Sequence, residues 1–189
     1  MKKTWLILII TFLPSFFLVS NAQPKVGFKA GLNSSHLSGF NGSNRLSLHT
    51  GFFVQYTITS EWHFQPELLY SGEGQQYSQD EIERNLSLSY IQLPLMIQYF
   101  LLQKFYVECG PQFAVLTRAI DKGSDNDKLN VKRSLRNFQF GMGFGLGVNV
   151  HKCIGFYGRY DLGLTDITLF GNSIDRSRIG QLGMTLRFK

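Results

Sequence analysis

The chain has 189 residues, of which 43% are hydrophobic and 14% aromatic, and its formal net charge at pH 7 is +6. This length indicates one domain, and no run of Lys and Arg interleaves with aromatic residues, so the composition excludes a typical nucleic-acid-binding protein. Cys109 and Cys153 lie too far apart in the sequence to indicate a metal site, and we expect two free thiols.

The N-terminus has the pattern of a signal peptide. Lys2 and Lys3 precede an apolar stretch, and Ser20-Asn21-Ala22 then provides small residues for cleavage. We predict a signal peptide over residues 1–22 and one β-barrel domain over residues 23–189. Removal of the two lysines leaves a formal charge of +4. This pattern predicts Sec-type export.

Eight segments alternate apolar and polar residues with the period of two that is typical of strands. They cover residues 26–33, 48–58, 62–71, 89–99, 105–117, 138–150, 154–164 and 180–188. In the sixth segment, large apolar residues alternate with glycine or a small amide. The large residues are Phe138, Phe140, Met142, Phe144, Leu146, Val148 and Val150, and the small ones are Gln139, Gly141, Gly143, Gly145, Gly147 and Asn149. A face without side chains suits a narrow, crowded interior, so the large residues are predicted to face lipid.

The connections between these segments alternate in length. Those near residues 59–61, 101–104 and 151–153 are tight, whereas 34–47, 72–88, 118–137 and 165–179 are long and polar. Short periplasmic turns, long external loops and an even strand number are typical of outer-membrane barrels. We therefore predict an all-β fold, an eight-stranded antiparallel up-and-down transmembrane β-barrel with short periplasmic turns and four long extracellular loops. An aromatic girdle beside the turns is predicted from Tyr56, Trp62, Phe64, Tyr99, Phe100, Phe105, Phe156 and Phe188.

Three prolines, Pro66, Pro94 and Pro111, fall inside predicted strands. Proline donates no hydrogen bond to a β-ladder, so we expect bulges at these positions. The register of the third, fourth and fifth strands is therefore left open by one residue.

Four segments together resemble the PorT-type outer-membrane β-barrel family of Bacteroidota. They are Val26-Gly-Phe-Lys-Ala-Gly-Leu-Asn33, Gln65-Pro-Glu-Leu-Leu-Tyr-Ser71, Tyr90-Ile-Gln-Leu-Pro-Leu95 and Glu108-Cys-Gly-Pro-Gln112. The resemblance implies an integral outer-membrane barrel. The family takes its name from a member needed for type IX secretion, which implies an accessory role in secretion as an alternative function.

The C-terminal segment resembles the β-signal read by the barrel-assembly machinery. Gln181, Gly183, Leu186 and Phe188 fill its polar, glycine and two apolar places, and Lys189 departs from the pattern because such strands usually end on the aromatic residue. The resemblance implies that this machinery is a partner during biogenesis.

Charged residues collect on the face predicted to point inward: Lys29, Glu67, Glu108, Arg159, Asp161 and Arg187. An eight-stranded barrel is only wide enough for side chains to fill, and buried charges must pair. We predict a structural network that plugs the lumen. The alternatives are a gated proton or ion path, or an acid–base pair of Glu67 and Glu108.

The predicted function is that of a non-enzymatic integral outer-membrane protein with a structural or surface-interaction role. Alternatives are an accessory subunit for secretion or envelope assembly and, third, a lipid-modifying enzyme, for which His36 and His49 lie near serines in the sequence. No catalytic, cofactor or metal residues are predicted, since Asp121, Asp125 and Asp127 lack a calcium-binding pattern. The expected partners are outer-membrane lipid, the assembly machinery and an unknown surface or secretion partner, with no nucleic acid.

Overall fold

A computed structural model describes residues 23–37, 42–79, 82–122, 128–130, 135–166 and 176–188. The predicted signal peptide over residues 1–22 lies outside the described residues. The strands in chain order are β1 (Lys25–Leu37), β2 (Gly42–Thr57), β3 (Trp62–Gln79), β4 (Ile82–Phe100), β5 (Phe105–Lys122), β6 (Lys128–Asn130), β7 (Phe138–Asn149), β8 (Ile154–Gly163) and β9 (Ser177–Arg187).

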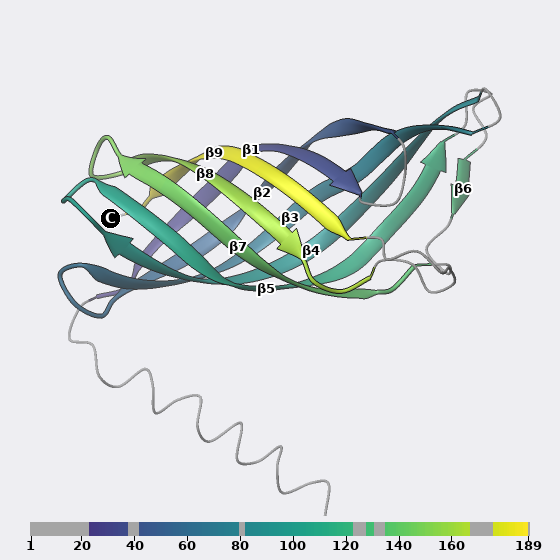
Figure 1. The fold of residues 1–189 in the computed structure, drawn as a ribbon. Helices are drawn as coiled ribbons and strands as arrows, with labels where there is room; N and C mark the ends of the chain where they lie inside the picture. Colours follow the sequence, from purple (N-terminus) through teal and green to yellow (C-terminus); the bar gives the residue numbers. More distant parts are fainter. Residues whose placement is uncertain are drawn as a thin grey trace, which may run out of the picture.

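Eight of these strands close into an antiparallel barrel (Figure 1). Each of β1 to β4 pairs with the next strand, β5 pairs with β7, and β7, β8 and β9 continue the sheet until β9 pairs with β1. The short strand β6 pairs with β5 at Ile120–Lys122, beyond the part of β5 that pairs with β7. The predicted fold class is confirmed. Within the described parts of the chain, no helix is long and apolar enough to cross a membrane.

Side chains face outward or inward as the period of two predicts. On β7, Phe144 is 48% and Leu146 67% exposed on the outer wall, whereas Gly143 and Gly147 are buried. Cys109 is exposed on β5 and Cys153 lies in a turn, and both are free thiols. The outward apolar residues thus form the lipid-facing band of the barrel.

Most of the aromatic girdle lies on the outer wall at the end of the barrel that carries the tight turns, here called the turn end. The rings of Trp62 and Tyr99 pack with centroids 4.8 Å apart. Phe100 is an exception, because its ring packs against His63 and Tyr106 at the mouth of the lumen. Its even position in β4 puts it on the inward face, so its assignment to the girdle was wrong.

The strands β3, β4 and β5 are much longer than predicted. They contain 18, 19 and 18 residues, against 12, 10 and 11 in β7, β8 and β9. About 9–11 residues suffice for a tilted crossing of the membrane. The strands β2 to β5 therefore continue as a wall beyond the ends of β7 to β9, at the end opposite the tight turns, here called the loop end (Figure 1).

We name residues 72–79, 82–90 and 116–122 of this wall the platform. The prediction of a loop was therefore wrong for most of residues 72–88 and for the start of residues 118–137. It was also wrong for the parts of residues 34–47 that belong to β1 and β2. The prediction failed because most outward residues beyond Tyr70, Ile91 and Val115 are polar, although the backbone ladder continues.

The three strand prolines interrupt the ladder without shifting its register. The pairings of β3 with β2 and β4 keep one register on both sides of Pro66, and the same holds at Pro94 and Pro111. The bulges predicted at these prolines are therefore wrong. A missing donor removes a hydrogen bond but inserts no extra residue. A register shift between β4 and β5 lies instead at Ser89 and Tyr90.

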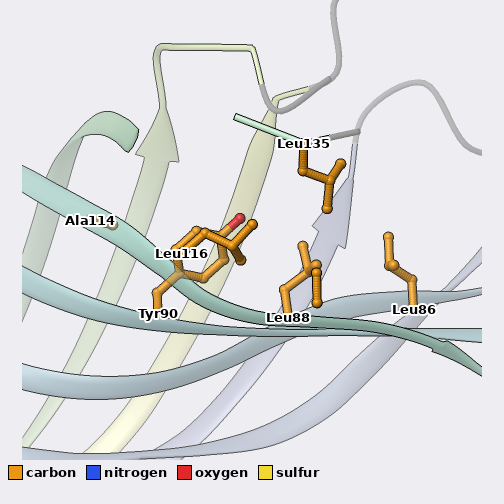
Figure 2. Packing of buried hydrophobic residues seen from close by; sticks show 7 residues of the cluster. Leu86, Leu88, Tyr90, Ala114, Leu116 and Leu135 are labelled. Carbon is orange, nitrogen blue, oxygen red and sulfur yellow. The ribbon is translucent and has the colours of Figure 1, made fainter. Parts of the chain in front are cut away.

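An apolar cluster lies on the inner side of the platform, at the loop end of the lumen (Figure 2). Its members are Leu86, Leu88, Tyr90, Ala114, Leu116, Ala119 and Leu135. Leu135 comes from the segment before β7 and points toward Leu88, which is fully buried (Figure 2). The backbone of this segment is held at β5, where the N–H of Leu116 donates to the carbonyl of Asn137 at 2.7 Å.

The outward position of Phe144 in the middle of β7 allows a direct test of the assigned facing. Phe144→Arg places a charge against lipid and should lower the free energy of unfolding by about 2–4 kcal/mol. Urea titration of the protein in bilayers would measure the loss. The control Phe144→Leu should remain close to wild type. Equal stability of wild type and Phe144→Arg would show that this face does not contact lipid.

Candidate functional site

The lumen contains a buried ion cluster that four strands contribute to: Lys29 from β1, Glu67 from β3, Glu108 from β5 and Arg159 from β8. Arg159 lies at the centre. Its Nη1 and Nη2 donate to the two carboxylate oxygens of Glu67 at 2.9 and 2.8 Å. Its Nε and Nη2 donate to Oε1 of Glu108 at 2.8 and 2.6 Å. One guanidinium from β8 therefore joins two carboxylates from β3 and β5, the two strands that flank β4 in the opposite wall.

Lys29 and two glutamines make further contacts with the carboxylates of the cluster. Lys29 Nζ forms an ion pair with Glu67 Oε1 at 2.8 Å and lies 3.9 Å from the ring centroid of Tyr157. Gln65 and Gln98 donate to Glu67 and Glu108 at 2.8 and 2.9 Å. All four charged side chains are at most 4% exposed. Buried charges are tolerated when they are paired and hydrogen-bonded in this way.

The glycines of β7 provide the space for this cluster. A Cβ atom on Gly145 would lie 3.0 Å from the side chain of Glu108, and one on Gly147 would lie 2.3 Å from the Tyr106 ring. On Gly143 it would lie 2.7 Å from Asp161 Oδ1. The stripped face of β7 therefore lies directly under the large inward side chains of β5 and β8.

Four of the six predicted network residues meet in this cluster, and two do not. Asp161 is 1% exposed, but neither of its oxygens accepts a hydrogen bond from any residue that the structure describes. Arg187 lies at the turn end, where its Nη2 hydrogen-bonds the side-chain oxygen of Asn149. The charge pattern therefore identified inward residues, but it did not identify which of them reach one another.

Sequence reasoning missed a second polar layer on the loop side of the cluster. His49 hydrogen-bonds the side chains of Asn33 and Tyr157. Glu73 is fully buried and accepts hydrogen bonds from Gln92 at 2.8 Å and from Ser177 at 3.2 Å. The signal for Glu73 was the period of two that continues from Glu67, but the Gly- and Gln-rich composition beyond it had indicated a loop.

The turn end of the lumen has an opening of about 410 Å³, lined by Lys25, Gln55, His63, Phe100, Asn149 and Arg187 among others. It lies on the periplasmic side if the short turns are periplasmic, as is usual in these barrels. The lumen is therefore wide at the turn end and filled by side chains farther in.

The residues of the predicted assembly signal lie on β9 and directly after it. Gln181 is buried, and Leu186 and Phe188 are exposed on the outer wall. A Cβ on Gly183 would lie 2.7 Å from the hydroxyl of Tyr157. Their recognition by the assembly machinery stays a prediction.

Among the described residues, no contact supports the alternative chemistries that the sequence suggested. Glu67 and Glu108 are both held by Arg159, so neither is free to exchange a proton with a substrate. No hydrogen bond joins a histidine to a serine among the described residues. The described residues also contain no group of three or more His, Cys, Asp and Glu placed for a metal. Asp121 lies buried in β5, and Asp125 and Asp127 fall outside the described residues.

The sequence model of the outer membrane protein beta-barrel domain family matches residues 21–169. The chain belongs to this family. It is therefore an integral protein of the outer membrane, which agrees with the lipid-facing band and with the predicted localisation.

Two solved structures share the barrel fold. Ail, the attachment invasion locus protein of Yersinia pestis, is 11% identical with a TM-score of 0.52, and the match covers 88% of this chain and 100% of that chain. Neisserial surface protein A is 12% identical with a TM-score of 0.56, and the match covers 87% and 97%. At this identity the similarity shows the fold alone. No match was found among curated proteins.

Arg159 offers the sharpest test of the ion cluster. Arg159→Met leaves Glu67 and Glu108 buried without their shared cation, so it should lower the free energy of unfolding by about 3–5 kcal/mol. Urea unfolding in lipid vesicles would measure this loss. Arg118→Met, at an exposed site on β5, is the matched control and should change stability by about 0.5 kcal/mol or less. Adding Glu108→Gln to Arg159→Met leaves Lys29 and Glu67 as a balanced pair, so it should restore much of the stability, and no restoration would contradict the assigned pairing.

Proposed function

We propose that the protein is a non-enzymatic surface-contact protein of the outer membrane, in which a plugged barrel supports a platform on the outer side. The platform carries the proposal, because β3 to β5 continue well beyond the length needed to cross the membrane. A paired, hydrogen-bonded segment presents its side chains in fixed positions, as a contact surface requires. The ion cluster and the apolar cluster fill the lumen beneath the platform. This filling favours a barrel that holds the platform in place over a barrel that conducts ions.

The outer face of the platform suggests the chemistry of the partner. Arg118 and Lys122 are exposed on β5, and their neighbours across the ladder are Ser89 and Asn85 of β4. Asp121, between them in sequence, is buried on the other face. We infer a partner with negative charge, such as a phosphorylated or acidic polysaccharide of a cell surface.

Three finer assignments belong to the same proposal. We infer that the chain is of PorT type within its family, from the segments that resemble that group. We also propose that residues 1–22 are removed on export and that the β9 signal engages the barrel-assembly machinery. The accessory secretion role and the lipid-modifying activity have no specific support in the described residues, so the surface-contact role is preferred. The names of Ail and Neisserial surface protein A, which refer to attachment and to the cell surface, are in line with this choice.

The plugged lumen can be tested by conductance. Purified protein in planar bilayers should show no large, steady current, because the Arg159 cluster crosses the lumen with every charge paired. A reproducible open channel of porin size would contradict the plug and would favour the transport alternative.

The contact role can be tested by charge reversal on the platform. Cells that display Arg118→Glu or Lys122→Glu should bind a polyanion-coated surface severalfold less than cells with the wild-type protein. Lys104→Glu, at an exposed turn residue on the other end of the barrel, should bind as wild type does. Heat-modifiable gel migration would verify that all three variants fold. Equal binding by all variants would rule out the platform as the contact surface.

A further inference from the structure

A small polar cavity lies in the lumen on the loop side of the ion cluster. Its volume is about 20 Å³, and its polar lining consists of Glu73, Gln92, Gln112, Gln139, Asp161 and Ser177. A cavity holds a water-sized occupant when this volume exceeds about 10–15 Å³. The cavity therefore has room for one such occupant and not for several.

Oxygen atoms without partners line this cavity. Both carboxylate oxygens of Asp161 and the amide oxygens of Gln92 and Gln112 accept no hydrogen bond from the described part of the chain. These side chains are 1%, 2% and 7% exposed. Buried polar atoms are nearly always hydrogen-bonded in native proteins, so four unpartnered acceptors around one cavity indicate a ligand that interacts with oxygen.

The amide of Gln92 is oriented by a neighbour. Its Nε2 donates to Glu73 Oε1 at 2.8 Å, which leaves its Oε1 as the unpartnered atom. Ser177 Oγ donates to the other oxygen of Glu73 at 3.2 Å. Glu73 is therefore fixed in the cavity wall by neutral donors.

The charges around the cavity are unbalanced. In the ion cluster, Lys29 and Arg159 offset Glu67 and Glu108, so that cluster is neutral. Glu73 and Asp161 form no ion pair with any Lys, Arg or His among the residues that the structure describes. Two buried carboxylates without a paired Lys or Arg are strongly unfavourable in their charged form, so the cavity favours a bound positive charge.

From these observations we propose that the cavity is a binding site for a calcium-like divalent cation. Calcium takes six to eight oxygen ligands from carboxylates, amide carbonyls and water, and the unpartnered atoms here are all oxygens of these kinds. Magnesium keeps several waters, which do not fit in about 20 Å³. Zinc and copper prefer nitrogen or sulfur ligands, and the described lining provides neither imidazole nor thiolate.

The site goes beyond the surface-contact function, because it joins strands at the base of the platform. Glu73 lies on β3, Gln92 on β4, Gln112 on β5 and Asp161 on β8. A cation bound by these residues ties the three platform strands to the short side of the barrel. Calcium would therefore stiffen the platform as well as neutralise the lumen.

The test uses the full mature chain, extracted from outer membranes and freed of metal with a chelator. Calorimetric titration with Ca²⁺ should show one site per chain, and Ca²⁺ should raise the temperature of thermal unfolding. Asp161→Asn and Glu73→Gln should each weaken Ca²⁺ binding at least tenfold. Because both substitutions remove an unbalanced buried charge, these variants should unfold without metal at or above the temperature of metal-free wild type.

The matched control is Glu61→Gln, which removes an exposed carboxylate at the turn end and should leave Ca²⁺ binding unchanged. Tb³⁺ emission excited through tyrosine gives a second measurement on the wild-type chain, since Tyr90 accepts a hydrogen bond from Gln139 in the cavity wall. Ca²⁺ should compete with this emission. No Ca²⁺ binding by wild type, equal binding of Mg²⁺, or unchanged binding by Asp161→Asn would each overturn the proposal.

Discussion

The pairing of Arg159 with Glu67 and Glu108 is the interaction on which the interior of this barrel depends. The guanidinium comes from β8 and the carboxylates from β3 and β5, so the bonds cross the lumen instead of following the wall. Burying a charged guanidinium or carboxylate in an apolar surrounding costs several kcal/mol of folding free energy, and pairing together with hydrogen bonding offsets that cost. Here Gln65 and Lys29 provide further hydrogen bonds to Glu67, and Gln98 provides one to Glu108. An eight-stranded barrel is narrow enough for one arginine to reach both partners.

The same constraint explains the glycine strand. Inward side chains from β5 and β8 occupy the space above β7. A Cβ atom on Gly145 would lie 3.0 Å from Glu108 and one on Gly147 would lie 2.3 Å from Tyr106, and both distances are shorter than an ordinary van der Waals contact. The large side chains on the outer face of β7 contact lipid, while the inner face has no space for side chains larger than glycine at these positions. The alternation of large residues with glycine is thus a consequence of the ion cluster and the membrane acting on opposite faces of one strand.

The period of two was enough to predict the closed barrel, the strand facing and the inward charges, because facing depends only on the parity of each residue. It was not enough to predict which inward charges meet. Asp161 and Arg187 share the parity of Arg159, but contact across the lumen also depends on height along the barrel, which strand tilt determines. The platform was not predicted because polar residues were taken to mark loops. Apolar outward residues indicate contact with lipid, but a strand that leaves the membrane keeps its backbone hydrogen bonds without them. Glu73 was not predicted as an inward residue for the same reason, although it lies an even number of residues after Glu67 and so has the same facing.

The side chains that line the lumen differ in polarity and charge from the turn end to the loop end. From the turn end inward there is an open mouth, then a neutral ion cluster, then a layer with two unbalanced carboxylates, and finally an apolar cluster under Leu135. The strand β5 contributes to all three inner layers and β3 to the first two, and both strands also form part of the platform. The short strands β7 to β9 carry no comparable extension. The interior contacts of the lumen and the extension beyond it are therefore combined on the same side of the barrel, at β3 to β5.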